Sequence, residues 1–235
     1  MSEIELKFVI DETMAGRLWA RAKELKLLSG SRKTSTLRSI YLDTPEHALK
    51  DAGIALRLRR VGRRWTQTVK IKAKLHGGLS QVDELENPAP GGLLCLEAIP
   101  DASVRDEIIR RVNGSPLQPV CETVMKRAAC ELSLGEGTRA ELAIDVGEIR
   151  ADGRSAELRE AEIELVEGSP AGLFDIAHAL FPDGGLRFSR VSKAARGYLL
   201  AGEGQIDPPL VPRNAEAIAL DPTQTAEQAA RDIPP

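Results

Sequence analysis

The sequence is poor in the residues on which several common chemistries depend. It has three cysteines and three histidines in 235 residues. The cysteines form no CxxC pair, which argues against a disulfide framework and favours a reducing compartment, so we expect a cytoplasmic protein. The histidines, His47, His76 and His178, are too scattered along the chain to suggest a metal triad. The chemistry is therefore expected to rest on other side chains.

Long apolar runs and an excess of positive charge are also missing. No uncharged apolar run approaches the roughly 20 residues that a membrane-spanning helix needs. The first residues carry charge at Glu3, Glu5 and Lys7, without the apolar region of a secretory signal. The chain has 32 basic and 35 acidic residues, a net charge of −3, whereas nucleic-acid-binding domains are usually basic. We therefore expect neither a membrane nor a nucleic acid as partner.

What the sequence does contain is alternation of apolar with charged residues, which is typical of strands. Strands are expected at about 3–9, 34–43, 54–61, 64–73, 79–86, 120–134, 139–150 and 155–167. Helical spacing or capping residues predict helices at about 11–28, 45–53, 102–112, 170–180 and 192–200. About eight strands joined by tight turns predict an antiparallel barrel or a sandwich with peripheral helices, in the α+β, mainly β class.

The composition changes near residue 202. Six of the fourteen prolines lie in the last 28 residues, which have few large apolar side chains. We therefore expect one domain over residues 1–202, followed by a proline-rich linker or tail over residues 203–235.

The charges are segregated by strand, and alternation assigns each one to a face. Basic residues form the pairs Arg57 with Arg59 and Lys70 with Lys72, whereas acidic residues form the pairs Glu84 with Glu86, Glu141 with Asp145, and Glu162 with Glu164. In a sandwich these faces would simply be solvated. If the helices instead cover the apolar faces, the charged faces point into a lumen. Interior charges on that scale must be hydrated, paired or neutralised by a ligand, and such a lumen suits a metal-chelated polyphosphate.

Several motifs occur in one order along residues 1–202. They are ExExK at 3–7, YxDTP at 41–45, GxALRxR at 53–59, WxQTxK at 65–70, EIELVEG at 162–168 and SKAARGY at 192–198. Together they resemble the CYTH superfamily, the triphosphate tunnel metalloenzymes. The resemblance implies a closed eight-stranded antiparallel barrel whose lumen binds a triphosphate with Mg²⁺ or Mn²⁺. The SKAARGY motif and the tail are similar to a bacterial subgroup in which this domain precedes a helical CHAD domain, whose start the tail would contain.

The resemblance also implies roles for individual residues. Phosphate would be bound by Lys7, Arg57, Arg59, Lys70, Lys72, Arg127 and Lys193, with Lys7 and Lys70 as catalytic residues. Metal would be bound by Glu3, Glu5, Asp145, Glu162 and Glu164. The register of Arg127 is open by one residue because Lys126 precedes it, and Glu84 and Glu86 match the family pattern only loosely.

Three functions fit such a lumen. The first is a metal-dependent hydrolase that cleaves inorganic triphosphate, and other triphosphates as a wider option, to diphosphate and phosphate. The second is a class IV-type adenylate cyclase, which needs a nucleoside pocket and is disfavoured by an aromatic content of 3%. The third is a non-catalytic polyphosphate-binding module, in which the carboxylates would have no purpose.

Overall fold

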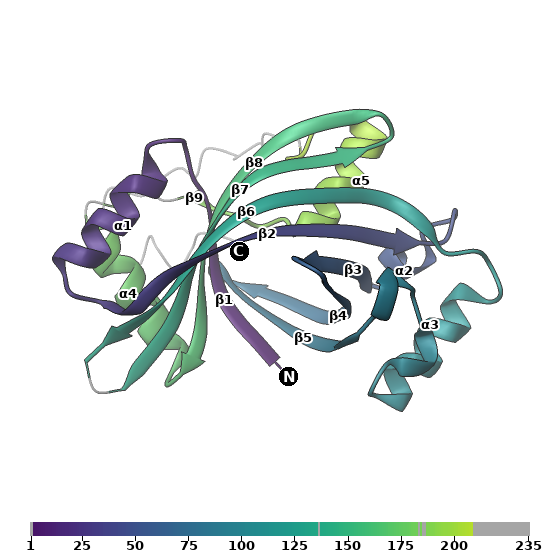
Figure 1. Cartoon of the computed structure of the whole chain (residues 1–235), viewed down its shortest axis with the longest axis horizontal. Coiled ribbons are helices and arrows are strands. Elements are labelled where there is room, and N and C mark those ends of the chain that lie inside the picture. Colours follow the sequence, from purple (N-terminus) through teal and green to yellow (C-terminus); the bar gives the residue numbers. More distant parts are fainter. Residues whose placement is uncertain (1, 136, 183, 185–186, 209–235) are drawn as a thin grey trace, which may run out of the picture.

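The strands form one closed antiparallel barrel (Figure 1). The computed structural model describes residues 2–135, 137–182, 184 and 187–208. The strands are β1 (Ser2–Val9), β2 (Leu28–Asp43), β3 (Ala55–Val61), β4 (Arg64–His76), β5 (Leu79–Pro88), β6 (Gln118–Leu134), β7 (Thr138–Ala151) and β8 (Arg154–Glu167). Their order is β5-β4-β3-β2-β6-β7-β8-β1, and pairing of β1 with β5 closes the ring. A short strand, β9 (Arg187–Phe188), pairs with β1.

Five helices accompany these strands in the part of the chain that the structure describes. They are α1 (Met14–Glu24), α2 (Ala48–Asp51), α3 (Ala102–Val112), α4 (Pro170–Leu180) and α5 (Lys193–Glu203). Two 3₁₀ turns, Pro90–Gly92 and Leu96–Ala98, precede α3. Side chains cap three of the helices, because Asp101, Ser169 and Ser192 accept hydrogen bonds from first-turn amides of α3, α4 and α5.

The first helix is shorter than the sequence pattern suggested. Asp11 accepts hydrogen bonds from the amides of Thr13 and Met14, so the helix begins three residues after it. At the other end Lys26 has a φ of 56°, a left-handed conformation that ends the helical path. The chain therefore enters β2 at Leu28, and the prediction of a helix reaching residue 28 and a strand starting at 34 is wrong there.

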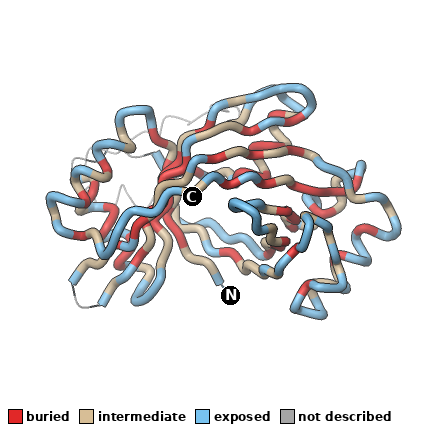
Figure 2. Tube along the Cα trace, in the orientation of Figure 1, coloured by how far each residue is buried: buried red, intermediate tan, exposed pale blue. Residues whose placement is uncertain are grey.

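The apolar faces of the strands point outward, under helices. Leu6 and Ile163 are buried together with Leu18 of α1 and Ile176 of α4. On another side of the barrel, Leu56 and Val69 are buried in a second cluster that includes Ile108 of α3. Figure 2 shows buried residues concentrated along the strands and exposed residues on the loops. This arrangement confirms the barrel and excludes the sandwich, in which these side chains would form one central core.

Helix α5 packs against the inward faces of β6, β7 and β8. Its Leu200 belongs to a cluster with Met125, Ile149 and Leu158, and Leu158 shares its strand face with the charged residues further along β8. The close approach depends on Gly197, since a Cβ atom there would lie 2.0 Å from the sulfur of Cys121. One part of the interior is thus filled by apolar side chains and α5, and the charged part lies beside it.

Candidate active site

The interior of the barrel contains a cavity of about 1370 Å³. Lys50 of α2 and Glu203 line it, but most of its charged lining residues come from six strands and from the start of α5: Glu3, Glu5, Lys7, Arg57, Arg59, Lys70, Glu84, Glu86, Arg127, Glu162, Glu164 and Lys193. Alternation along each strand explains this set, because every second residue faces inward. Arg57 and Glu162 therefore line one lumen and do not lie on opposite outer surfaces.

On one side of the lumen, cations of β3 and β4 are paired with carboxylates of β5 and β1. Arg57 donates to Glu84 at 3.0 Å. Lys70 contacts Glu84 at 2.8 Å and Glu3 at 2.5 Å. Burial would raise the pKa of Glu84, but its hydrogen bond with Glu3 and the charges of Arg57 and Lys70 lower it to about 2. Glu84 is therefore an ionised anchor that orients two cations.

Arg59 differs from the other cations of the lumen. Its Nε donates to the Ser39 hydroxyl at 3.1 Å, and within the described ranges it makes no ion pair with a carboxylate. Burial, followed by the charge of Arg57, lowers the pKa of Arg59 to about 10. Arg57 also has an unsatisfied donor, since its buried Nε has no hydrogen-bond partner among the described residues. Two neighbouring guanidinium groups thus leave positive charge and donors available to an anion.

Across the lumen, two carboxylates are already neutralised by cations. Arg127 donates to both carboxylate oxygens of Asp145, at 2.8 and 2.7 Å, and to Glu162 at 2.5 Å. Lys193 contacts Asp145 at 2.9 Å and Glu162 at 2.8 Å. Burial opposes ionisation of Glu162, but Lys193, Lys7 and Arg127 hold its pKa well below the usual range. This cluster presents Arg127 and Lys193 in fixed positions.

The acidic residues of β1 and of the end of β8 are less well compensated. Glu5 lies opposite Glu164 in the β1–β8 ladder, and its contact with Lys7 is 3.0 Å. Burial, then the charges of Glu3 and Glu5, raise the pKa of Glu164 to about 7. Burial raises the pKa of Glu3 and of Glu5 as well. These three carboxylates repel one another, and a cation would relieve the repulsion.

The donor type of these residues fits a hard divalent cation, because carboxylate oxygens are the preferred ligands of Mg²⁺ and Mn²⁺. In the described ranges no three His, Cys, Asp or Glu side chains converge closely enough to form a complete metal site. Asp145 and Glu162 are each held by two or more cations, whereas Glu3 and Glu5 each pair with one lysine and Glu164 has no ion pair in the described chain, so these last three are the better candidates for a metal. A bound phosphate would supply further oxygen ligands.

The expectation that Lys72 shares the lumen with Lys70 is wrong. The β4–β5 pairing shifts register between Ile71 and Lys74, and Lys72 has a φ of 54°, so alternation breaks at this bulge. The Lys72 side chain is 72% exposed, lies 3.6 Å from Asp83 and does not line the cavity. The other predicted site residues line the cavity, except Asp145. Asp145 does not line it but forms ion pairs with Arg127 and Lys193, which do.

Several interior residues were left without a role by the sequence argument. Glu84 and Glu86 do line the lumen, so their uncertain register is resolved. Glu160, Ser189 and Arg196 are buried next to Lys193. Alternation along β8 could have found Glu160, which precedes Glu162 and Glu164 at the same spacing, whereas nothing in the sequence connects Ser189 to them.

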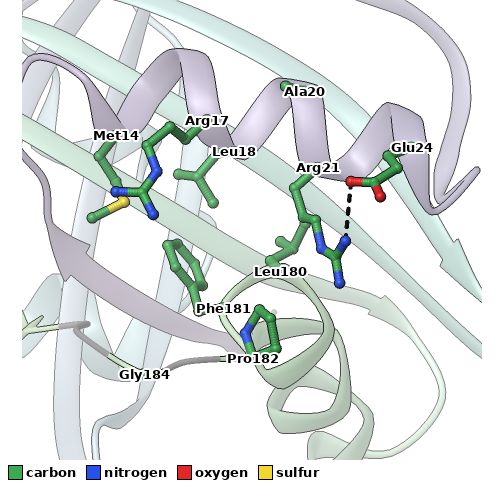
Figure 3. A pocket seen from close by; sticks show the side chains of 10 residues that line it. All are labelled: Met14, Arg17, Leu18, Ala20, Arg21, Glu24, Leu180, Phe181, Pro182 and Gly184. Atoms are coloured by element: carbon green, nitrogen blue, oxygen red, sulfur yellow. Dashed lines mark hydrogen bonds and ion pairs between the residues drawn. The ribbon is translucent and has the colours of Figure 1, made fainter.

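A smaller cavity of about 520 Å³ lies between α1 and α4, outside the barrel lumen (Figure 3). Its lining is largely apolar, with Leu18, Leu180 and Phe181, and its charged residues are Arg17, Arg21 and Glu24. Arg21 and Glu24 pair with each other at 3.0 Å. The lumen, with its opposed sets of cations and carboxylates, is therefore the candidate active site.

None of the described helices is long and apolar enough to cross a membrane.

A barrel with a lumen of this kind defines the triphosphate tunnel class of fold. The CYTH domain model matches residues 1–198, and the chain belongs to the CYTH family. A curated inorganic triphosphatase of Haemophilus influenzae is 29% identical over 204 residues, which are 86% of this chain and 56% of the relative. The chain thus spans little more than half the length of that relative.

Solved structures share the fold. A Hippeastrum protein, described as a putative adenylyl cyclase with a dominant triphosphatase activity, superposes with a TM-score of 0.57 at 18% identity, over 88% of this chain and 98% of that one. A putative adenylate cyclase from Bacillus halodurans gives a TM-score of 0.51 at 21% identity, over 81% and 93% of the two chains. At these identities the likeness concerns the fold alone.

Proposed function

We propose that this protein is a metal-dependent hydrolase that cleaves inorganic triphosphate to diphosphate and phosphate within the barrel lumen. The observation that carries the proposal is Arg59, a half-buried residue that lies next to the buried Arg57 and has no carboxylate ion-pair partner in the described chain. Withdrawing a cation from water without a counter-charge is costly unless a ligand neutralises it. The H. influenzae relative, named inorganic triphosphatase, supports the same substrate.

The cations surround the lumen and would contact a linear triphosphate from several directions. Arg57, Arg59 and Lys70 approach from β3 and β4, and Lys7, Arg127 and Lys193 approach from β1, β6 and α5. Charge-assisted hydrogen bonds from these groups would hold the phosphate chain and stabilise the negative charge that develops on the leaving diphosphate. Lys7 and Lys70 each contact carboxylates of β1, so they also connect the anion and metal regions.

The carboxylates would hold the metal. Glu3, Glu5 and Glu164 are the proposed ligands, and Asp145 and Glu162 serve mainly to orient Arg127 and Lys193. When bound, Mg²⁺ or Mn²⁺ neutralises phosphate charge and lowers the pKa of a coordinated water. The residues of the chain contribute the rest: they fix the triphosphate, exclude bulk water and keep carboxylates next to the cations.

The test is release of phosphate from triphosphate, ATP and thiamine triphosphate, with Mg²⁺, with Mn²⁺ and with EDTA. We expect triphosphate to be the preferred substrate, to yield one phosphate per diphosphate, and to be stable in EDTA. Arg59→Met should lose most activity, whereas Arg60→Met, which alters an exposed arginine on the adjacent outward position, should retain it. Cyclic AMP as the main product from ATP, or no turnover of triphosphate, would overturn the proposal.

A further inference from the structure

A buried network lies next to Lys193, among residues that do not line the lumen cavity. Glu160 is 0% exposed and Arg196 is 1% exposed. The Glu160 carboxylate contacts Lys193 Nζ at 2.8 Å and Arg196 Nε at 3.5 Å. Ser189 joins the two, because its hydroxyl donates to Glu160 at 3.1 Å and accepts from Arg196 at 3.0 Å.

Lys193 is therefore shared between two sets of carboxylates. Glu162, which lines the lumen, holds its ammonium group together with Asp145, and Glu160, which lies opposite Asp145 in the β7–β8 ladder and does not line the lumen, contacts it as well. Attraction between buried charges is strong, since little water screens it. If Glu160 had no other cation, its charge would act on Lys193 alone and would draw the ammonium group away from Glu162, the carboxylate that lines the lumen.

Arg196 supplies that other cation from a fixed position. Its Nη1 donates to the Ile206 carbonyl at 3.1 Å and also contacts the Asp207 carboxylate. Ser189 is fixed in turn, because its amide donates to the Lys7 carbonyl at 2.7 Å. The guanidinium is thus held by three groups, the Ile206 carbonyl, the Asp207 carboxylate and the Ser189 hydroxyl, and it lies close to Glu160, one helical turn from Lys193 on α5.

We propose that Arg196 is a positioning residue: it balances the charge of Glu160 and thereby keeps Lys193 directed at the bound phosphate chain. The inference rests on the proposed function of the lumen as a triphosphate site. It assigns a reason for the arginine of the SKAARGY motif, which does not line the cavity and cannot itself contact a substrate there.

The test compares Arg196→Met with the double variant Glu160→Gln/Arg196→Met. Triphosphate affinity is measured by calorimetry, and KM and kcat by phosphate release. Arg196→Met should weaken triphosphate binding about tenfold and raise KM more than it lowers kcat. The double variant removes both charges and should bind within about threefold of wild type. Arg196→Lys, which keeps a cation near Glu160, should also retain binding.

The matched control is Arg139→Met, which removes an exposed arginine that pairs with Glu131 and Glu167. It should bind triphosphate as wild type does. Unchanged binding in Arg196→Met, or a double variant as weak as the single one, overturns the inference, because a purely structural arginine would not be rescued by neutralising Glu160. If Arg196→Met does not fold, triphosphate binding by the double variant and by Arg196→Lys is compared with wild type instead. Binding within about threefold of wild type in both supports the inference, and weaker binding in either overturns it.

A ligand-free structure of the variants separates this inference from the function. In Arg196→Met the Lys193 ammonium group should move away from Glu162 toward Glu160. In the double variant it should remain where it is in wild type. An unmoved Lys193 in Arg196→Met overturns the positioning role even if the wild-type protein hydrolyses no triphosphate, and a moved one supports it whichever reaction the lumen performs.

Discussion

Glu5 and Glu164 lie directly opposite each other in the β1–β8 ladder, with both side chains lining the lumen. Like charges in this position destabilise an antiparallel pair. The protein offsets the repulsion only partly, through the contact of Glu5 with Lys7 at 3.0 Å. Tolerated repulsion between a buried and a half-buried carboxylate is the arrangement expected where a cation binds during function.

Replacing Glu5 by Gln tests this interpretation. The change keeps the shape of the side chain and removes one charge from the acidic pair. We expect activity at saturating Mg²⁺ to fall at least ~100-fold, with little loss of stability, because relief of repulsion compensates for the lost contact with Lys7. Steady-state phosphate release and urea unfolding measure the two effects, and near wild-type turnover would contradict metal binding at Glu5.

The pH dependence of stability follows from Glu164. Its pKa is raised from 4.5 to about 7 in the folded protein, by burial and then by Glu3 and Glu5. Between these pH values the folded state holds a proton that the unfolded chain releases, so the free energy of unfolding should fall as the pH rises from about 4.5 to about 7. Urea unfolding in EDTA measures this fall.

Glu164→Gln should make that decline shallower, because the variant has no group to titrate at this position. Glu167→Gln is the matched control, since Glu167 lies at the exposed end of the same strand. An equal pH dependence in wild type and Glu164→Gln would show that Glu164 titrates at its ordinary value.

Ligand linkage gives a third prediction. A ligand that binds only the folded state at ~100 times its dissociation constant stabilises it by roughly 2.7 kcal/mol. Triphosphate with Mg²⁺ should therefore raise the melting temperature, and Arg59→Met should reduce the shift. Orthophosphate should act much more weakly because it reaches only part of the set of cations. Equal shifts from both anions would indicate a nonspecific charged surface.

Much of this site could be predicted from the sequence because strand alternation is a local rule. Knowing which residues alternate gives the face of Arg57, Arg59 and Glu162 without any tertiary information. Whether that face points inward depends on what covers the opposite face. The predicted helices have apolar stripes that need to be buried, and packing them on the apolar strand faces turns the charged faces inward. The distribution of ion pairs could not be predicted, since it depends on distances across the lumen.

The tail over residues 203–235 stays a prediction. Helix α5 ends at Glu203, and the described chain continues to residue 208. Residues 209–235, where we expect a linker or the start of a CHAD domain, lie outside the described residues. The pairing of Arg196 with Asp207 could not be predicted from the sequence either. Asp207 follows the end of α5, and its position depends on how the chain turns there.

Lys72 shows where the alternation rule fails and provides the last prediction. At the bulge between Ile71 and Lys74, β4 has two residues where β5 has one, so Lys70 points into the lumen and Lys72 points outward. Two lysines that alternation alone would treat as equivalent are thus separated by backbone geometry.

Lys70→Met and Lys72→Met form a matched pair of variants with the same loss of charge. Loss of a charged donor at a reacting phosphate typically costs ~100-fold in rate, so we expect that loss for Lys70→Met and less than about twofold for Lys72→Met. Equal losses in kcat/KM for triphosphate would mean that Lys72 enters the lumen during turnover and that the bulge is not maintained in solution.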